Sequence, residues 1–247
     1  MEERYSRNRL YLSEREQNLI KDYKIFLGGA GIGSIVAECA LRLGFEHITI
    51  VDGDKVERSN LNRQNYTESD IGKYKAECLA KRLISINPKA QIDYHVKFLD
   101  ANNIEKLLDG HDVAINALDF KDETPFIFDK ICQKGKIPVL HPYNFGWAGF
   151  VTVVNPSGHS ISELAEEFKE FELKVAEYVT ENGTIRNQSV EWLDRVVTQY
   201  REESKTLPPP QLSIASWIAA GLCSTVMYHL AMGNSIDYFP KYYLSSL

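Results

Sequence analysis

A short apolar run that ends in a glycine-rich turn constrains the fold of this chain most strongly. Lys24-Ile-Phe-Leu27 leads into Gly28-Gly-Ala-Gly-Ile-Gly33, and apolar positions at helical spacing follow from Ser34 to Leu43, before Gly44. Such spacing indicates an amphipathic helix, and a glycine just past its last residue is a common stop. The segment therefore predicts a buried strand, a tight turn and a helix that packs back onto the strand.

The alternation of strand and helix continues along the chain. Further strands are predicted at 47–52, 92–98, 112–119 and 137–141, with helices at 70–87 and 122–134. Strands that alternate with helices form βαβ units, in which the strands are parallel and the crossovers right-handed. We therefore predict an α/β, Rossmann-like fold with a mostly parallel sheet flanked by helices.

The second half of the chain has a different character. Residues 161–203 are strongly polar and predict a small helical insertion lobe of two helices, separated at Asn182-Gly183. The nearly uncharged stretch Ile214–Met232 predicts a long helix packed on the sheet, and the aromatic end, 237–244, an edge strand or a packing tail. We divide the chain into a core with an N-terminal helical arm (1–160), a lobe (161–206) and a C-terminal helix and tail that complete the core (207–247).

Charge and composition limit the classes of partner. The 247 residues include 28 basic and 34 acidic side chains, with a formal net charge of −6, which argues against an extended nucleic-acid surface. The chain starts without an apolar signal core, and no apolar run approaches the length needed to cross a bilayer. We therefore predict a cytoplasmic protein without a membrane partner.

The most informative polar residues follow the predicted strand at 47–52. In open α/β sheets, ligands bind at the carboxyl ends of the strands, and an acidic residue such as Asp52 binds the ribose in dinucleotide folds. Asp52 and the glycine turn alone favour an NAD-dependent dehydrogenase. Asn60, Arg63, Gln64 and Lys75 instead suit a triphosphate attacked at its α-phosphate, because fixed cations stabilise the negative charge that develops there.

Taken together, these segments resemble the ThiF/MoeB/HesA family of adenylating enzymes, which share their fold with ubiquitin-activating enzymes. The matching segments, in family order, are Arg4–Arg7, the glycine turn, Asp52–Asp54, Ser59–Gln64, Asp70–Lys75, Asn87-Pro88 and Ala117–Asp119. The helix from Ile214 resembles a later crossover helix of the family. Each segment alone is a weak signal, whereas their joint order and spacing are specific.

The resemblance implies ATP and Mg²⁺ as cofactors and gives each matched residue a role. The residues it implies for nucleotide binding are Gly28, Gly29, Gly31, Gly33, Asp52, Asp54, Asn60 and Gln64. The residues it implies for catalysis are Arg63 and Lys75 on the phosphates, Asp119 as the Mg²⁺ ligand, and Arg7 on the γ-phosphate of a neighbouring subunit. The last role makes a homodimer part of the site. The alternative roles are a surface salt bridge for Arg63, a solvated helix residue for Lys75 and a helix cap for Asp119.

Several positions depart from the family pattern. Ala30 makes the glycine turn irregular, Tyr74 replaces a proline, and Phe120 replaces the asparagine that usually follows the metal-binding aspartate. The four cysteines, at positions 39, 78, 132 and 223, are predicted to be buried and form no zinc-binding pairs. No cysteine lies between residues 132 and 223, the region of the thioester cysteine in ubiquitin-activating relatives, so we expect no internal thioester.

We therefore predict an adenylyltransferase that activates a carboxylate, the C-terminus of a small ubiquitin-like or sulfur-carrier protein, and releases pyrophosphate. Two alternatives remain open. One is a relative that acts on a small or tRNA-borne carboxylate, as in threonylcarbamoyl-adenosine dehydration. The other is a non-catalytic nucleotide-binding partner protein. His141, after the fifth predicted strand, is interpreted as structural in preference to an acid or base.

Overall fold

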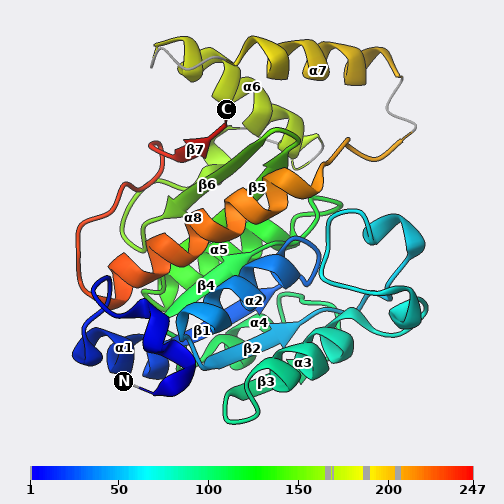
Figure 1. Ribbon diagram of the computed structural model, residues 1–247. Helices are drawn as coiled ribbons and strands as arrows, with labels where there is room; N and C mark the ends of the chain where they lie inside the picture. Colours follow the sequence, from blue (N-terminus) through cyan, green and yellow to red (C-terminus); the bar gives the residue numbers. More distant parts are fainter. Residues whose placement is uncertain (1, 165–167, 169, 186–189, 204–206, 247) are drawn as a thin grey trace.

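The computed structural model describes residues 2–164, 168, 170–185, 190–203 and 207–246. Its centre is a seven-stranded sheet in the order β3-β2-β1-β4-β5-β6-β7 (Figure 1). The strands are β1 (Lys24–Gly28), β2 (His47–Val51), β3 (Gln91–His95), β4 (Val113–Asn116), β5 (Val139–Phe145), β6 (Ala148–Val154) and β7 (Tyr243–Ser245). The first five pair in parallel, and β6 and β7 are antiparallel additions. The predicted mostly parallel α/β fold is confirmed.

Some predicted strand limits were wrong. The third and fourth strands end at His95 and Asn116, earlier than predicted, and the residues beyond them form loops. Strand β6 was not predicted at all. Every residue of β6 is buried, so its sequence lacks the alternation that marks a half-exposed strand. Strand β7 is the edge strand that was one of the two predictions for the aromatic end.

Helices cover both faces of the sheet. One face packs against α1 (Glu14–Asp22), α2 (Gly33–Leu43), α3 (Lys75–Ile86) and α8 (Ser213–Ala231). The opposite face packs against α4 (Ile104–Leu108), α5 (Thr124–Lys134), α6 (Phe171–Ile185) and α7 (Glu191–Glu202). Four short 3₁₀ helices complete the described elements: η1 (Glu3–Asn8), η2 (Arg58–Asn60), η3 (Glu68–Asp70) and η4 (Ile161–Leu164).

Helix α8 packs on the sheet, as predicted, against β6, β5 and α2. By length and composition alone it is also apolar enough to span a membrane, so the statement that no run approaches that length was wrong. The burial of Ala219, Cys223 and Met227 against the sheet explains its low polarity. Cys78, Cys132 and Cys223 are buried as predicted, whereas Cys39 is partly exposed.

The two lobe helices lie at the end of the molecule that holds β5, β6 and β7 (Figure 1). Helix α6 runs through Asn182 and Gly183 to Ile185, so the break predicted there was wrong. Phe171 and Val175 of α6 and Leu193 of α7 belong to the same apolar cluster as the sheet. The lobe therefore shares its core with the sheet. The division into three segments stays a prediction.

Candidate nucleotide-binding site

The glycine turn between β1 and α2 is packed against the end of β4. Gly29 has a φ of +92°, and a Cβ atom there would lie 2.3 Å from the carbonyl oxygen of Ala117. Both the left-handed backbone and the close approach require glycine. The turn is also tied to β2, because the Gly29 N–H donates to the Val51 carbonyl at 2.9 Å. The neighbouring strands thus fix the path of the turn.

The backbone N–H groups at the start of α2 are available to a ligand. Within the described ranges, the N–H groups of Gly31, Ile32 and Gly33 donate no hydrogen bond, and no side chain caps the helix. Free N–H groups and the positive end of the helix dipole favour a phosphate or another anion. The sheet edge and this helix end together form the candidate site.

Asp52 connects the end of β2 to this turn. Its Oδ2 accepts the Ala30 N–H at 2.6 Å, and its Oδ1 accepts the Asp54 N–H at 2.7 Å. Burial raises the pKa of the Asp52 carboxyl, and the two N–H groups and the Lys75 ammonium oppose that rise. Lys75, the first residue of α3, is itself buried, and its Nζ lies 3.2 Å from Asp54 Oδ2. The structure therefore brings these predicted residues together and excludes a solvated position for Lys75.

Arg63 lies in the loop after β2, and its guanidinium donates hydrogen bonds both to its own loop and to Gln211 near the start of α8. Its Nη1 donates to the Ser59 carbonyl and to Asn62 Oδ1, both at 2.8 Å, and its Nε donates to Gln211 Oε1. Burial lowers the pKa of the Arg63 guanidinium, and Asp119 acts in the opposite direction. Among the described residues Arg63 forms no salt bridge, so its role is not that of a surface ion pair. Gln211, which lies two residues before the start of α8, was missed by the sequence prediction.

The two amide side chains of this loop that are predicted to bind the nucleotide, Asn60 and Gln64, have different environments. Asn60 Oδ1 accepts the Glu57 N–H at 3.0 Å, which closes a turn of the loop. Gln64 Oε1 is buried without a hydrogen-bond partner in the part of the chain that the structure describes. The Gln64 amide lies beside Gly31, where a Cβ atom would be 3.4 Å from its nitrogen. The amide nitrogen is thus the end of Gln64 nearer the turn, and the buried oxygen lacks the donor that a ligand would supply.

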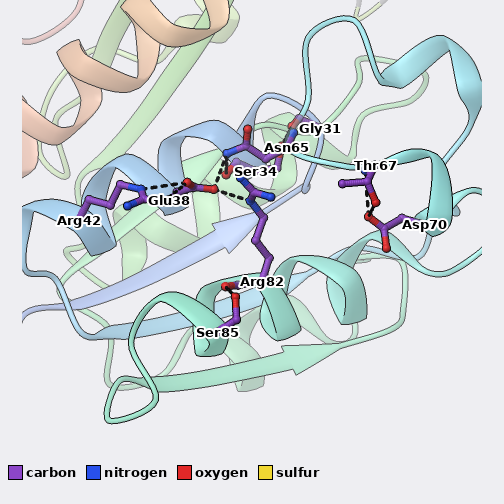
Figure 2. Close-up of polar contacts among 9 residues, drawn as sticks. All are labelled: Gly31, Ser34, Glu38, Arg42, Asn65, Thr67, Asp70, Arg82 and Ser85. Atoms are coloured by element: carbon purple, nitrogen blue, oxygen red, sulfur yellow. Dashed lines mark hydrogen bonds and ion pairs between the residues drawn. The ribbon is translucent and has the colours of Figure 1, made fainter.

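A network of charged and polar side chains holds this loop against α2 (Figure 2). The buried Glu38 carboxylate accepts hydrogen bonds from Arg42 at 2.9 Å, from Asn65 at 2.9 Å and from Arg82. Asn65 directly follows Gln64, and its N–H donates to Ser34 Oγ at 3.0 Å. Burial alone would raise the pKa of Glu38, but Arg82 and Arg42 outweigh it and lower the pKa. The network fixes Gln64 beside the turn.

The loop after β4 contributes a second charged pair. Asp119 Oδ2 lies 2.8 Å from Lys121 Nζ, and both side chains are mostly exposed. The hydrogen bond and charge of Asp119 raise the pKa of Lys121, and the charges of Asp54 and Asp52 add to that effect. The sequence prediction missed Lys121, although a lysine two residues after a strand-end aspartate was a usable signal. Asp119 does not cap α5, whose N-cap residue is Glu123.

Arg7 does not join the site of its own chain. It lies on η1, where the buried Tyr5 hydroxyl donates to Glu46 at 2.8 Å. Glu46 directly precedes β2, whereas Asp52 directly follows it, so the full strand separates η1 from the site. At about 3.3 Å per residue this strand spans roughly 16 Å. The contribution of Arg7 from a neighbouring subunit stays a prediction.

Two further sequence hypotheses concern His141 and the metal. His141 is fully buried in β5, and its Nε2 lies 2.9 Å from Asp129 Oδ2, so it has no surface to offer a substrate. The described residues contain no group of three or more His, Cys, Asp and Glu side chains that could hold a metal ion. A metal ion at Asp119 would therefore also need phosphate and water oxygens as ligands.

Comparison with curated proteins finds partial matches to adenylating enzymes. The chain is 35% identical over 159 residues to the sulfur carrier protein ThiS adenylyltransferase of Bacillus subtilis, covering 62% of this chain and 47% of that protein. It is 28% identical over 146 residues to the SAMP-activating enzyme E1 of Haloferax volcanii, covering 59% and 54%. It is 30% identical over 165 residues to the tRNA threonylcarbamoyladenosine dehydratase of Escherichia coli, covering 66% and 59%. The match thus spans about half the length of these relatives.

Solved structures show the same fold. E. coli MccB with AMPCPP and MccA superposes with a TM-score of 0.70 at 18% identity, over 99% of this chain and 71% of that chain. PaaA superposes with a TM-score of 0.67 at 22% identity, over 94% and 72%. The family model described as "ThiF family" matches residues 5–245, which include the turn, the Asp52 loop, Lys75 and Asp119. On this match and on the arrangement of these residues, the chain belongs to the ThiF family.

Proposed function

We propose that this protein is an ATP-dependent adenylyltransferase that activates a carboxylate to an acyl-adenylate and releases pyrophosphate. The observation that carries the proposal is the position of the buried Lys75 ammonium, 3.2 Å from Asp54, beside a glycine turn with free N–H groups. An ammonium and N–H groups at one strand edge suit the phosphates of a nucleotide. The adenylyltransferases among the relatives support the same reaction class.

The chain's own residues suit the steps of this reaction. The substrate carboxylate is already ionised at neutral pH and attacks the α-phosphorus without a protein base. The new bond is between a carboxylate oxygen and phosphorus, and the bond that breaks joins the α-phosphorus to the oxygen bridging to the β-phosphate. Arg63 and Lys75 would stabilise the negative charge that builds up on the phosphate oxygens and on the departing pyrophosphate.

Asp52 and Asp119 have separate tasks in this proposal. Asp52, held by the Ala30 and Asp54 N–H groups, would accept hydrogen bonds from the ribose hydroxyls. Asp119 has an exposed carboxylate at the edge of the same site. Mg²⁺ prefers carboxylate oxygens as ligands, so this residue fits the metal. Bound there with the nucleotide, Mg²⁺ would neutralise phosphate charge.

The substrate that we propose is the C-terminus of a small ubiquitin-like or sulfur-carrier protein. Support comes from the relatives named for ThiS and for SAMP activation. The sequence has no cysteine between residues 132 and 223, so we expect its own chemistry to end at the acyl-adenylate. We also propose a cytoplasmic homodimer in which Arg7 completes the partner's site.

A second candidate is dehydration of a tRNA-borne threonylcarbamoyl group, because two dehydratases are 30% identical to the chain over 66% of its length. The net charge of −6 favours the carrier protein over tRNA. Two other functions would give different binding results. A non-catalytic nucleotide-binding protein would bind ATP without turning it over. A dehydrogenase would bind NAD in preference to ATP.

The test is ATP–pyrophosphate exchange with purified protein, measured with carrier proteins that end in Gly-Gly, with tRNA, and with neither. We expect carrier-dependent exchange that is lost in Arg63→Ala and Asp119→Ala. Arg58→Ala is the matched control, because Arg58 lies on the same loop in an exposed pair with Glu68. Stimulation by tRNA alone would establish the second candidate. Exchange retained in Arg63→Ala and Asp119→Ala would refute the proposed site.

A further inference from the structure

The first turn of α6 packs directly on the loop that follows β4. The Phe171 ring is fully buried, and its centroid lies 4.4 Å from that of Phe120 and 4.9 Å from that of Phe126. Phe120 and Phe126 also contact each other, with ring centroids 5.4 Å apart. Phe120 directly follows Asp119, so this aromatic cluster anchors the loop that carries the proposed metal ligand. The lobe and the site thus share a packed boundary.

Glu172 adds a polar contact at the same boundary. Its Oε1 accepts the Phe120 backbone N–H at 3.4 Å, between Asp119 and Lys121 in sequence. Burial raises the pKa of the Glu172 carboxyl, Asp119 raises it further, and Lys121 lowers it. Glu172 therefore lies in the electrostatic field of both members of the Asp119–Lys121 pair.

The position of Glu172 is unfavourable for stability alone. A partly buried carboxylate loses hydration, and a second carboxylate nearby adds repulsion. Phe171 already supplies apolar packing at this boundary, and an apolar side chain at position 172 would avoid both costs. Stability alone therefore does not explain a glutamate at position 172, whereas its hydrogen bond to the Phe120 N–H gives this side chain a role in the loop.

We propose that Glu172 and Phe171 are positioning residues for Asp119, so that the helical lobe forms a wall of the nucleotide site. Glu172 holds the backbone between Asp119 and Lys121, and Phe171 holds the ring of Phe120. The two contacts set the direction in which the Asp119 carboxylate faces the site. This inference rests on the proposed function for the role of Asp119, whereas the contacts themselves do not depend on it.

The first test uses the nucleotide-free protein and amide hydrogen exchange of residues 117–123. In Glu172→Leu, which removes the acceptor, we expect the Phe120 amide to exchange at least about tenfold faster. In Glu172→Gln, whose amide oxygen can still accept the N–H, we expect wild-type exchange. Glu177→Leu is the matched control, because Glu177 is a carboxylate of the same helix that pairs with Lys174 and Arg201. Unchanged exchange in Glu172→Leu would overturn the proposal.

The second test measures ATP affinity with and without Mg²⁺ by calorimetry. Mg²⁺ should increase the ATP affinity of the wild type, and in Glu172→Leu we expect this increase to be about tenfold smaller. Losses of this size are typical when a residue that orients a metal ligand is removed. The ATP affinity without Mg²⁺ should stay unchanged. Glu172→Gln should keep the wild-type effect of Mg²⁺ on ATP affinity. Phe171→Leu should lose as much of this effect as Glu172→Leu. Equal losses with and without Mg²⁺ would indicate a merely structural role and overturn the inference. If the wild type binds no ATP, the proposed function fails, and the exchange experiment still decides whether Glu172 positions the loop.

Discussion

The Asp52 carboxylate accepts a hydrogen bond from the backbone N–H of Ala30 at 2.6 Å, which links the end of β2 to the turn after β1. The other carboxylate oxygen accepts the Asp54 N–H, so one side chain orders both segments around the site. Ala30 is the position at which the turn departs from the G-x-G-x-x-G pattern, yet its N–H makes the shorter of these two contacts. The departure therefore does not prevent the turn from being tied to β2.

Gly29→Ala should destabilise the fold. The new Cβ would lie 2.3 Å from the Ala117 carbonyl oxygen, and the φ of +92° strains any residue but glycine. We expect the free energy of unfolding to fall by about 2–4 kcal/mol in urea titrations. Gly72→Ala is the control, because Gly72 has a φ of +81° with no atom near the added Cβ, and should lose only about 1 kcal/mol. Equal losses in both variants would contradict a steric role for Ala117.

Lys75→Met should abolish most activity and leave the fold intact. The methionine keeps the buried aliphatic volume but removes the ammonium next to Asp54. We expect kcat/KM for ATP–pyrophosphate exchange to drop about 100- to 1000-fold, the usual effect of losing one transition-state donor. Lys73→Met, an exposed lysine just before α3, serves as the control and should retain full exchange. A Lys75→Met protein with near wild-type exchange would remove Lys75 from the site.

Gln64→Met should separate stability from ligand binding. Gln64 Oε1 is buried with no partner among the described residues, so its removal should leave the free energy of unfolding unchanged or raise it slightly. Nucleotide affinity should fall about fivefold, because the hydrogen bond that this amide would make to the nucleotide is worth about 1 kcal/mol. Thermal unfolding and calorimetric ATP titration of the same preparation provide the two measurements. A variant that is destabilised but binds ATP normally would assign Gln64 to the fold alone.

Glu38→Gln should weaken the network in Figure 2. The amide keeps the size of the side chain but loses the charge that pairs with Arg42 and Arg82. Hydrogen bonds to a charged group contribute about 1.5–3 kcal/mol, and the partial exposure of both arginines places the expected loss at the lower end. Urea denaturation at neutral pH measures this loss. Glu105→Gln, which breaks an exposed pair with Lys134, should show no measurable change.

The contribution of Glu38 should also depend on pH. Its pKa is lowered in the folded state, so its stabilisation is fully present above the unfolded glutamate pKa of about 4.3. It is lost as the pH falls from that value through the lowered folded pKa. The difference in unfolding free energy between wild type and Glu38→Gln should therefore shrink below about pH 4. A difference that stays constant between pH 7 and pH 3 would show that charge is not its origin.

Local patterns were sufficient for much of the fold. The strand, glycine turn and helix at 24–43 depend on residues close in sequence, and the structure has β1 and α2 where the pattern indicates them. The two helices predicted for the lobe are present as α6 and α7, but the same patterns failed for β6 and for the break predicted at Asn182-Gly183. Full burial removes the alternation of β6, and packing of α6 against α7 and the sheet outweighs the helix-breaking tendency of Gly183.

For the site, the sequence by itself determined the chemical inventory: a carboxylate at Asp52, cations at Arg63 and Lys75, and a second carboxylate at Asp119, each in a loop after a strand or at the start of a helix. Only the tertiary structure decided which of them meet and what surrounds them. Gln211 contacts Arg63, Glu172 contacts the Asp119 loop, and Arg7 lies at the other end of β2. Local periodicity reports which face of an element is buried, whereas contacts between residues far apart in sequence depend on how the elements pack.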